Sequence, residues 1–172
     1  NPKTDTYWSG KAYGKVAEVA AIAHSLGMTA QANTLIQWLK SELADWFSAT
    51  TTGALDKTKY FAYDRDWSTL LGFEESFGSH QQLNDHHFHY GYFVRAAAEI
   101  CRTDAAWCGA QAYGPMIELL IRDYAAGRND QSPTIRPRRP IAAGRNDQSP
   151  TFQPRDPISA GIPIWSWLSP SS

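Results

Sequence analysis

Residues Leu83 to Phe93 read LNDHHFHYGYF, a stretch that places three histidines, one aspartate and four aromatic rings within eleven residues. Ordinary core packing does not require this density of imidazole and carboxyl groups. Four interpretations compete: a metal site, a catalytic carboxylate beside sugar-stacking rings, a histidine switch, or an aromatic helix. The surrounding sequence has to distinguish them.

Composition limits the class of protein. The chain has 172 residues, and 16 Lys and Arg against 17 Asp and Glu give a formal net charge of -1. The only basic run, Arg136 to Arg139, lies in a proline-rich segment, so we expect no nucleic-acid partner. No apolar run approaches the ~20 residues that cross a bilayer, so we expect no membrane insertion. The oligomeric state stays open.

Aromatic residues and cysteines add two further observations. Trp, Tyr and Phe make up 13% of the chain. Flat apolar rings are common platforms for sugar faces, although large cores use them too. Cys101 and Cys108 lie seven residues apart, and the sequence leaves both a disulfide and two free thiols open.

Two helices are predicted near the start of the chain. Tyr7 to Leu26 carries apolar residues at helical spacing, and Gly27 follows as a stop signal. Thr29 is a candidate N-cap for a second helix, in which apolar residues recur at steps of three and four as far as Phe47. The short connection predicts an antiparallel helical hairpin.

From Ser48 to Asn84 the helical periodicity fails. KYFAYD predicts a short strand or extended piece, DRDWSTLLGF an irregular segment, and GFEESFGSHQQLND a loop with hinges at Gly72 and Gly78. A long irregular connection inside a domain is usually functional. Helices are predicted again from the opening motif to about Arg102 and in AYGPMIELLIRDYA.

A helix over the opening motif places Asp85, His89 and Tyr92 on one face. Asp85 could instead serve only as an N-cap. A capping carboxylate accepts backbone N–H groups, which lowers its pKa, whereas a general acid needs surroundings that keep its proton near neutral pH. Each histidine taken alone is most simply a packed core residue.

A metal site would draw on His80, Asp85 and the histidines of the motif. His86 and His89, or Asp85 and His89, have spacings at which two side chains can share an ion. Adjacent His86 and His87 point apart on a helix, and neither an HExxH motif nor paired CxxC motifs support them. We therefore expect no metal and no cofactor.

The segment SFGSHQQLNDHHFHYGYFVRAAAEI resembles the signature of glycoside hydrolase family 81, the endo-β-1,3-glucanases or laminarinases, in which an NDHHFHYGYF block carries the catalytic acid. YWSGKAYGKVAEVAAIAHSLG, RDWSTLLGF and GPMIELLIRDYA resemble further family segments in the same order. The resemblance implies an all-α fold, part of an (α/α)6 barrel of antiparallel helix hairpins with a cleft at one end.

The resemblance also implies roles for five residues. Asp85 matches the general acid, and His89 matches a residue that lines the sugar site. Tyr7 and Lys11 match an aromatic residue and a lysine that face the cleft, and Trp67 falls in a cleft-side segment. The implied activity is endo-acting hydrolysis of β-1,3-glucan with inversion, by a secreted, extracellular protein.

An inverting mechanism needs a second carboxylate about 6.5–9.5 Å from the first to activate a water molecule. The resemblance places this base in a downstream segment of ESSSE type, which the sequence does not contain. The only local substitutes are Asp64, Asp66, Glu74 and Glu75. Residues 1–127 thus resemble a partial catalytic domain, and the alternative is a non-catalytic β-1,3-glucan-binding fragment.

Residues 128–172 are predicted to form a separate proline-rich tail. AAGRNDQSPTIRPRRPI (125–141) is followed at once by AAGRNDQSPTFQPRDPI (142–158), and the two copies differ at three of seventeen positions. Prolines break every candidate helix, and two copies fall short of the roughly three that a solenoid needs. We expect a disordered linker or a duplication error in the sequence itself.

Overall fold

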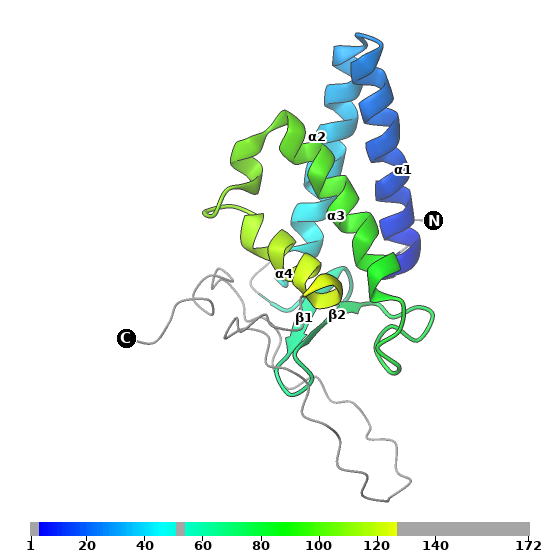
Figure 1. Ribbon diagram of the computed structural model, residues 1–172, viewed down its shortest axis with the longest axis vertical. Helices are drawn as coiled ribbons and strands as arrows, with labels where there is room; N and C mark the ends of the chain where they lie inside the picture. The colour runs from blue at the N-terminus through cyan, green and yellow to red at the C-terminus, as the bar shows by residue number, and fades with distance from the viewer. Residues whose placement is uncertain (1–3, 51–53, 127–172) are drawn as a thin grey trace, which may run out of the picture.

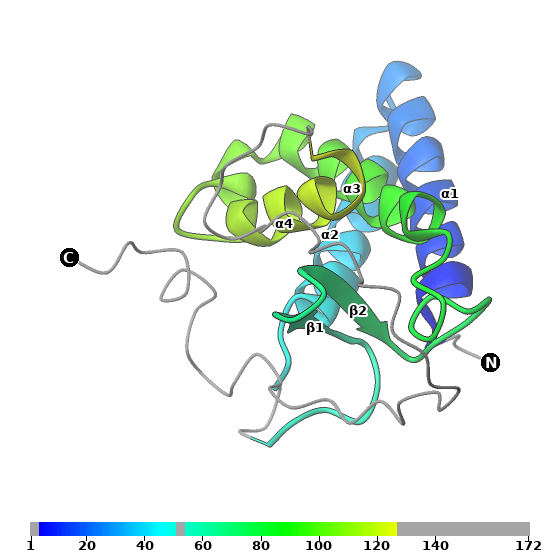
Figure 2. The ribbon, with the colours of Figure 1, turned by 60° about the horizontal axis from the view of Figure 1, so that its bottom comes forward.

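The structure is a computed structural model that describes residues 4–50 and 54–126. Within these described residues, four α-helices, one 3₁₀ helix and two strands follow in the order α1 (Thr6–Ser25), α2 (Thr29–Trp46), β1 (Tyr60–Asp64), β2 (Thr69–Phe73), α3 (His86–Thr103), η1 (Ala105–Cys108) and α4 (Gly114–Ala125). Figure 1 shows α1 and α2 as a long antiparallel hairpin with α3 beside it. Figure 2 shows the small sheet at one end of these helices.

The helical hairpin follows the predicted pattern except at one cap. Asp5 caps α1, because its Oδ1 accepts two backbone N–H groups of the first turn. Gly27 has a φ of 73° and lies after the end of α1, where glycine adopts this left-handed conformation at little cost. Met28 occupies the N-cap position of α2 and makes no side-chain bond, so the predicted Thr29 cap is wrong.

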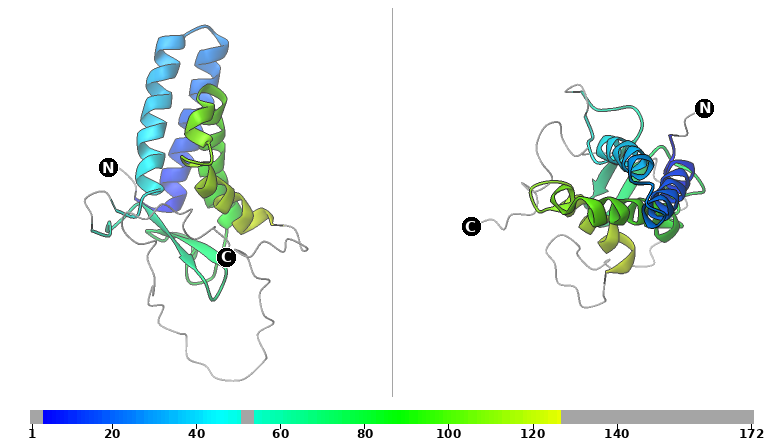
Figure 3. Two further views of the ribbon diagram at one scale, coloured as in Figure 1. Left: turned by 90° about the vertical axis from the view of Figure 1, so that its left-hand side faces the viewer. Right: turned by 90° about the horizontal axis from the view of Figure 1, so that it is seen from above.

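Close packing joins α1 to α3, and Figure 3 shows α1, α2 and α3 side by side. A Cβ atom added at Gly10 would lie 3.0 Å from the Phe93 ring and 3.2 Å from the His89 carbonyl oxygen. The core between the helices is aromatic, with Trp46 and Phe93 fully buried and their ring centroids 5.0 Å apart. Small residues on α1 thus bring the start of α3 close to the start of α1.

The sheet corrects two expectations, the all-α class and the irregular segment at 64–73. β1 and β2 pair antiparallel, with Tyr60 opposite Phe73 and Asp64 opposite Thr69. Four consecutive residues of β2 are buried, so the strand lacks the alternation of apolar and polar residues by which strands are recognised. The Asp64 carboxylate accepts two N–H groups of the intervening turn and thereby closes the hairpin.

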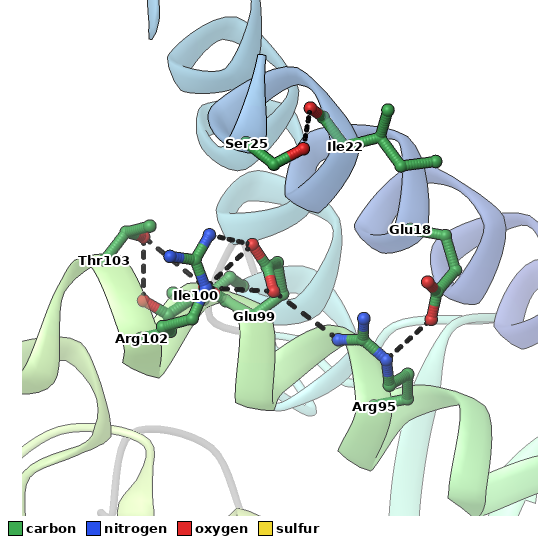
Figure 4. A network of polar contacts seen from close by, with 8 residues as sticks. All are labelled: Glu18, Ile22, Ser25, Arg95, Glu99, Ile100, Arg102 and Thr103. Carbon is green, nitrogen blue, oxygen red and sulfur yellow. Dashed lines mark hydrogen bonds and ion pairs between the residues drawn. The ribbon is translucent and has the colours of Figure 1, made fainter. Parts of the chain in front are cut away.

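Side-chain bonds tie α3 to its neighbours. Figure 4 shows Glu99 between Arg95 and Arg102, with Arg95 also reaching Glu18 on α1. Burial opposes ionisation of Glu99, but the hydrogen bond and charge of Arg102 outweigh it and lower the Glu99 pKa. The Cys101–Cys108 disulfide joins α3 to η1, which decides between the two alternatives that the sequence left open.

Two further predictions concern the chain as a whole. No helix within residues 4–50 and 54–126 has the length and apolar character needed to cross a membrane. The proline-rich tail at 128–172 and nearly all of the duplication lie outside the described residues.

Candidate active site

The motif LNDHHFHYGYF opens α3, and Asp85 occupies the N-cap position of that helix. Its φ and ψ are 55° and 22°, and its side chain makes no hydrogen bond to the first turn. The Asp85 carbonyl instead accepts the N–H groups of Phe88 and His89, at 2.9 and 3.0 Å. The Asp85 carboxyl is partly exposed and receives a 3.2 Å bond from the Asn84 amide. The side chain therefore does not perform the capping role that was the simplest alternative.

His89 lies one turn further along α3 and is buried, with 1% of its surface exposed. Its Nδ1 forms a 2.7 Å hydrogen bond with the hydroxyl of Thr6, at the start of α1. Burial lowers the pKa of His89, the charge of His86 lowers it further, and the carboxylates of Asp85 and Asp5 oppose this shift. His89 is thus a neutral imidazole near pH 7, held beside the Asp85 carboxyl.

Tyr7 is the centre of a ring cluster beside His89. Its ring centroid lies 4.8 Å from that of Phe77, 5.1 Å from that of Trp8 and 5.4 Å from that of His89. The Lys11 ammonium lies 5.4 Å from the Tyr7 centroid and 5.3 Å from the Trp8 centroid. The predicted helical spacing of Tyr7 and Lys11 therefore places them together, next to the N-terminal end of α3.

Phe77 and Trp8 belong to this cluster but were not among the predicted site residues. Their side chains are 58% and 44% exposed, so each presents ring surface to solvent. Asp5 holds the Phe77 loop against α1, because the Ser76 hydroxyl donates to its Oδ1 at 2.9 Å. An Asp before a helical apolar run is a recognisable cap signal, but the sequence carried no sign of the contact between Tyr7 and Phe77, which lie far apart along the chain.

Trp67 lies apart from the other predicted site residues. It sits in the turn between β1 and β2, and its backbone N–H donates to Asp64 Oδ1 at 2.9 Å. Its side chain is 46% exposed. Across the described residues, no ring contact joins Trp67 to the cluster around Tyr7. The structure thus brings together four of the five predicted residues: Tyr7, Lys11, Asp85 and His89.

The histidines of the motif diverge toward different partners. His89 meets Thr6, whereas the two ring nitrogens of His86 meet Asp123 and the Ser79 carbonyl. The ring of His80 is hydrogen-bonded to the Gly72 carbonyl, and burial lowers its pKa. In the part of the chain that the structure describes, no three His, Cys, Asp or Glu side chains converge in a geometry suited to a metal ion.

Three of the four local carboxylates that could replace the missing base, those of Asp64, Glu74 and Glu75, have other partners. Asp64 accepts two backbone N–H groups of its turn, and Glu74 accepts the Thr4 hydroxyl at 2.7 Å. Glu75 lies 4.0 Å from His80. These carboxylates serve contacts within the fold, and none of these contacts is with Asp85.

Comparisons with known proteins identify the family. Residues 1–138 match the glycosyl hydrolase family 81 C-terminal domain. The chain belongs to this family. The resemblance seen in the histidine-aromatic motif and its flanking segments is therefore confirmed.

Individual relatives agree with this assignment. Glucan endo-1,3-beta-D-glucosidases of Thermobifida fusca and Acetivibrio thermocellus are 47% and 46% identical to the chain, over 70% and 73% of its length. A mutant glycoside hydrolase family 81 protein from Clostridium thermocellum matches with a TM-score of 0.68 and 46% identity, over 74% of the chain. The chain spans 15% and 16% of the two relatives and 18% of the solved structure.

Proposed function

We propose that this chain forms the acid-bearing part of an endo-acting β-1,3-glucan hydrolase in which Asp85 is the general acid. One observation carries the proposal: the Asp85 carboxyl, at a helix N-cap, makes no capping bond and interacts electrostatically with a neutral His89, whose ring contacts a partly exposed ring cluster. The 46–47% identity to glucan endo-1,3-beta-D-glucosidases supports the substrate class.

The ring cluster suits the apolar faces of glucosyl units. Trp8 and Phe77 expose ring surface on which a sugar face can stack, and Lys11 and Tyr7 supply polar groups that can orient hydroxyls. The buried His89 lines this site from behind, through its ring contact with Tyr7. Trp67, in the hairpin turn, is proposed to contact longer glucan chains outside this cluster.

The proposed reaction inverts the anomeric centre. Asp85 gives its proton to the glycosidic oxygen as the bond from that oxygen to the anomeric carbon breaks. A water molecule attacks the anomeric carbon from the opposite face, and a second carboxylate, about 6.5–9.5 Å from the first, accepts the proton of the water. We propose that this second carboxylate comes from a part of the enzyme outside residues 4–126.

The structure also supports two proposals about the enzyme to which this chain belongs, namely its barrel fold and its secretion. The antiparallel hairpin of α1 and α2, with α3 packed on α1, is the arrangement expected for part of an (α/α)6 barrel. The Cys101–Cys108 disulfide supports secretion, because disulfides form and persist in oxidising compartments.

The general-acid role can be tested in a segment swap, with residues 4–126 replacing the matching segment of the Acetivibrio thermocellus glucanase. Asp85→Asn keeps the side-chain shape but removes the transferable proton, so we expect laminarin hydrolysis to slow by about 10²–10⁴-fold. Laminari-oligosaccharide binding should persist. Release of reducing ends measures the rate, and proton NMR of the fresh product reports its anomer.

The matched control is Glu118→Gln, the same change from carboxyl to amide on an exposed residue of α4. We expect it to leave the rate within about twofold of the unsubstituted swap, in line with other exposed substitutions. An Asp85→Asn rate close to that of the control would overturn the general-acid role, and a retained anomer would overturn inversion.

A further inference from the structure

A buried polar junction links α4, β2 and the first residue of α3. The Asp123 side chain, from α4, is only 2% exposed. Its Oδ1 accepts the Leu70 N–H and the Thr69 hydroxyl, both at 2.7 Å. Its Oδ2 lies 2.6 Å from Nδ1 of His86. A carboxylate is thus enclosed at the point where three elements meet.

The hydrogen bonds of His86 define its protonation state. Its Nε2 lies 2.8 Å from the Ser79 carbonyl oxygen, while its Nδ1 faces Asp123. With Asp123 ionised, both partners are acceptors, and because a neutral imidazole carries only one N–H, the ring then satisfies both as an imidazolium. His86 and Asp123 therefore form a buried ion pair, in which the carboxylate receives charge-assisted hydrogen bonds.

The surroundings of the pair leave it little freedom. The Tyr90 ring packs on His86 with centroids 4.5 Å apart, and the Tyr90 hydroxyl donates to the Leu70 carbonyl at 2.7 Å. Tyr90 is fully buried, and this burial raises its pKa well above the usual value. The Tyr90 hydroxyl thus acts as a donor that fixes β2, and β2 in turn holds Asp123.

His86 directly follows Asp85, whose φ of 55° is unfavourable for a residue with a side chain. Asp85 makes no side-chain bond to the helix that would hold this conformation. The anchored groups lie on either side of it: His86 is fixed by Asp123 and Ser79, and the loop before it is held by the Gln82 N–H, which donates to the Gly78 carbonyl at 3.0 Å. A shift of His86 would therefore be transmitted to Asp85.

We propose that Asp123 and His86 are positioning residues that hold Asp85 in its left-handed conformation and so aim its carboxyl at the substrate. Asp123 contacts neither Asp85 nor the ring cluster in the bonds described above; its effect passes through His86. The proposal rests on the proposed role of Asp85 as general acid, but its structural part can be measured without catalysis.

The test compares the 172-residue chain with its Asp123→Asn variant by NMR. In the unsubstituted chain we expect two ring N–H protons on His86. The Asp123→Asn side chain can present an amide donor to Nδ1, so the ring should lose one of these protons. Because the ion pair is then lost, the backbone chemical shifts of Asp85 and its φ-dependent scalar coupling should change.

The control is Asp104→Asn, which removes the 2.6 Å ion pair between Asp104, the N-cap residue of η1, and Lys40 of α2. Thermal unfolding reports the loss of stability in both variants. A merely structural role for Asp123 would lower the melting temperature and leave the signals of Asp85 as they are in the control. We expect the NMR signals of Asp85 to change in Asp123→Asn and to stay unchanged in Asp104→Asn.

Each outcome decides one point. A single ring N–H on His86 in the unsubstituted chain would overturn the ion pair, and unchanged Asp85 signals in Asp123→Asn would overturn the positioning role. If Asp123→Asn does not fold, Thr69→Val takes its place, because it removes one donor to Asp123. We expect Thr69→Val to change the Asp85 NMR signals by a smaller amount, and unchanged signals would again overturn the proposal. Failure of the unsubstituted chain to bind laminarihexaose would count against the proposed function alone.

Discussion

At the scale of residues, three aspartates occupy N-cap positions within residues 4–50 and 54–126, and one of them, Asp85, does not cap with its side chain. Asp5 accepts two N–H groups of α1, and Asp104 accepts the Trp107 N–H at the start of η1. Asp85 makes no such bond and has a positive φ. A missing cap costs about 0.5–2 kcal/mol, and departures of this kind concentrate at functional sites. The contrast within one chain favours a chemical role for Asp85.

The protonation of His89 gives a prediction about pH. Burial lowers its pKa below the ordinary 6.5, with a further contribution from His86. As the pH falls through 6.5, the unfolded chain therefore takes up a proton at His89 before the folded chain does. Because of this difference, His89 lowers the free energy of unfolding as the pH falls below 6.5, and it contributes no pH dependence to that free energy above this range. We expect its ring signals to titrate with a midpoint under 6.5 by NMR. A midpoint at or above 6.5 would contradict the buried, neutral state.

The ring cluster predicts a difference between two exposed aromatic residues. Phe77→Ala should weaken laminarihexaose binding roughly 5- to 10-fold, about 1–1.4 kcal/mol, because Phe77 contacts Tyr7 near the start of α3. Trp67→Ala should leave the binding of short oligosaccharides unchanged and weaken only that of longer glucans. Calorimetric titration of both variants measures this. Equal losses on laminarihexaose would show that the cluster extends to the hairpin turn.

At the scale of elements, the sequence predicted what depends on local periodicity. The apolar spacing of Tyr7 to Leu26 and of Ala32 to Phe47 corresponds to α1 and α2, since each helix buries one stripe. β2 was missed because both of its faces are buried, so no alternation marks it. The placement of Phe77 and Asp123 was not predictable, because their contacts with Tyr7 and His86 join segments far apart in the chain.

The contact between the sheet and α1 predicts a severe effect at Gly72. A Cβ atom there would lie 2.3 Å from Thr6 Cγ2 and 2.9 Å from the Phe61 ring. Gly72→Ala should destabilise the fold by about 1–3 kcal/mol or more through overpacking, and should displace Thr6 from His89. Denaturant unfolding measures the free energy.

The matched control for this change is Gly91→Ala in α3. A Cβ atom at Gly91 meets nothing within 4 Å. The same substitution should there stabilise the fold by about 0.4–1 kcal/mol, since alanine is the better helix former. Similar effects of the two substitutions would mean that β2 and α1 are less closely packed than the structure shows.

At the scale of the whole molecule, part of the helical hairpin lies uncovered. α1 and α2 extend beyond α3 in Figures 1 and 3, and several large apolar side chains on and between them are exposed: Val19, Ile22, Leu26, Met28 and Trp38. Apolar surface of this kind favours association with another surface. The solved family structure continues far beyond the matched region, since the chain covers only 18% of it.

We expect the 172-residue chain on its own to bind laminari-oligosaccharides but to hydrolyse laminarin poorly or not at all. It supplies a proposed acid in Asp85, whereas three of the four local carboxylates that could act as base have other partners, as in the Thr4–Glu74 bond. Without a second carboxylate the attacking water is not activated, so inversion cannot proceed at an enzymatic rate. Release of reducing ends measures turnover, and the segment swap is the positive control, because it joins Asp85 to a complete catalytic domain. If residues 4–126 bind glucan without taking part in catalysis, neither the 172-residue chain nor the segment swap would release reducing ends. Robust turnover by the chain alone, with inverted product, would show that a base lies within it, and Glu74→Gln and Glu75→Gln would then be the first variants to separate the candidates.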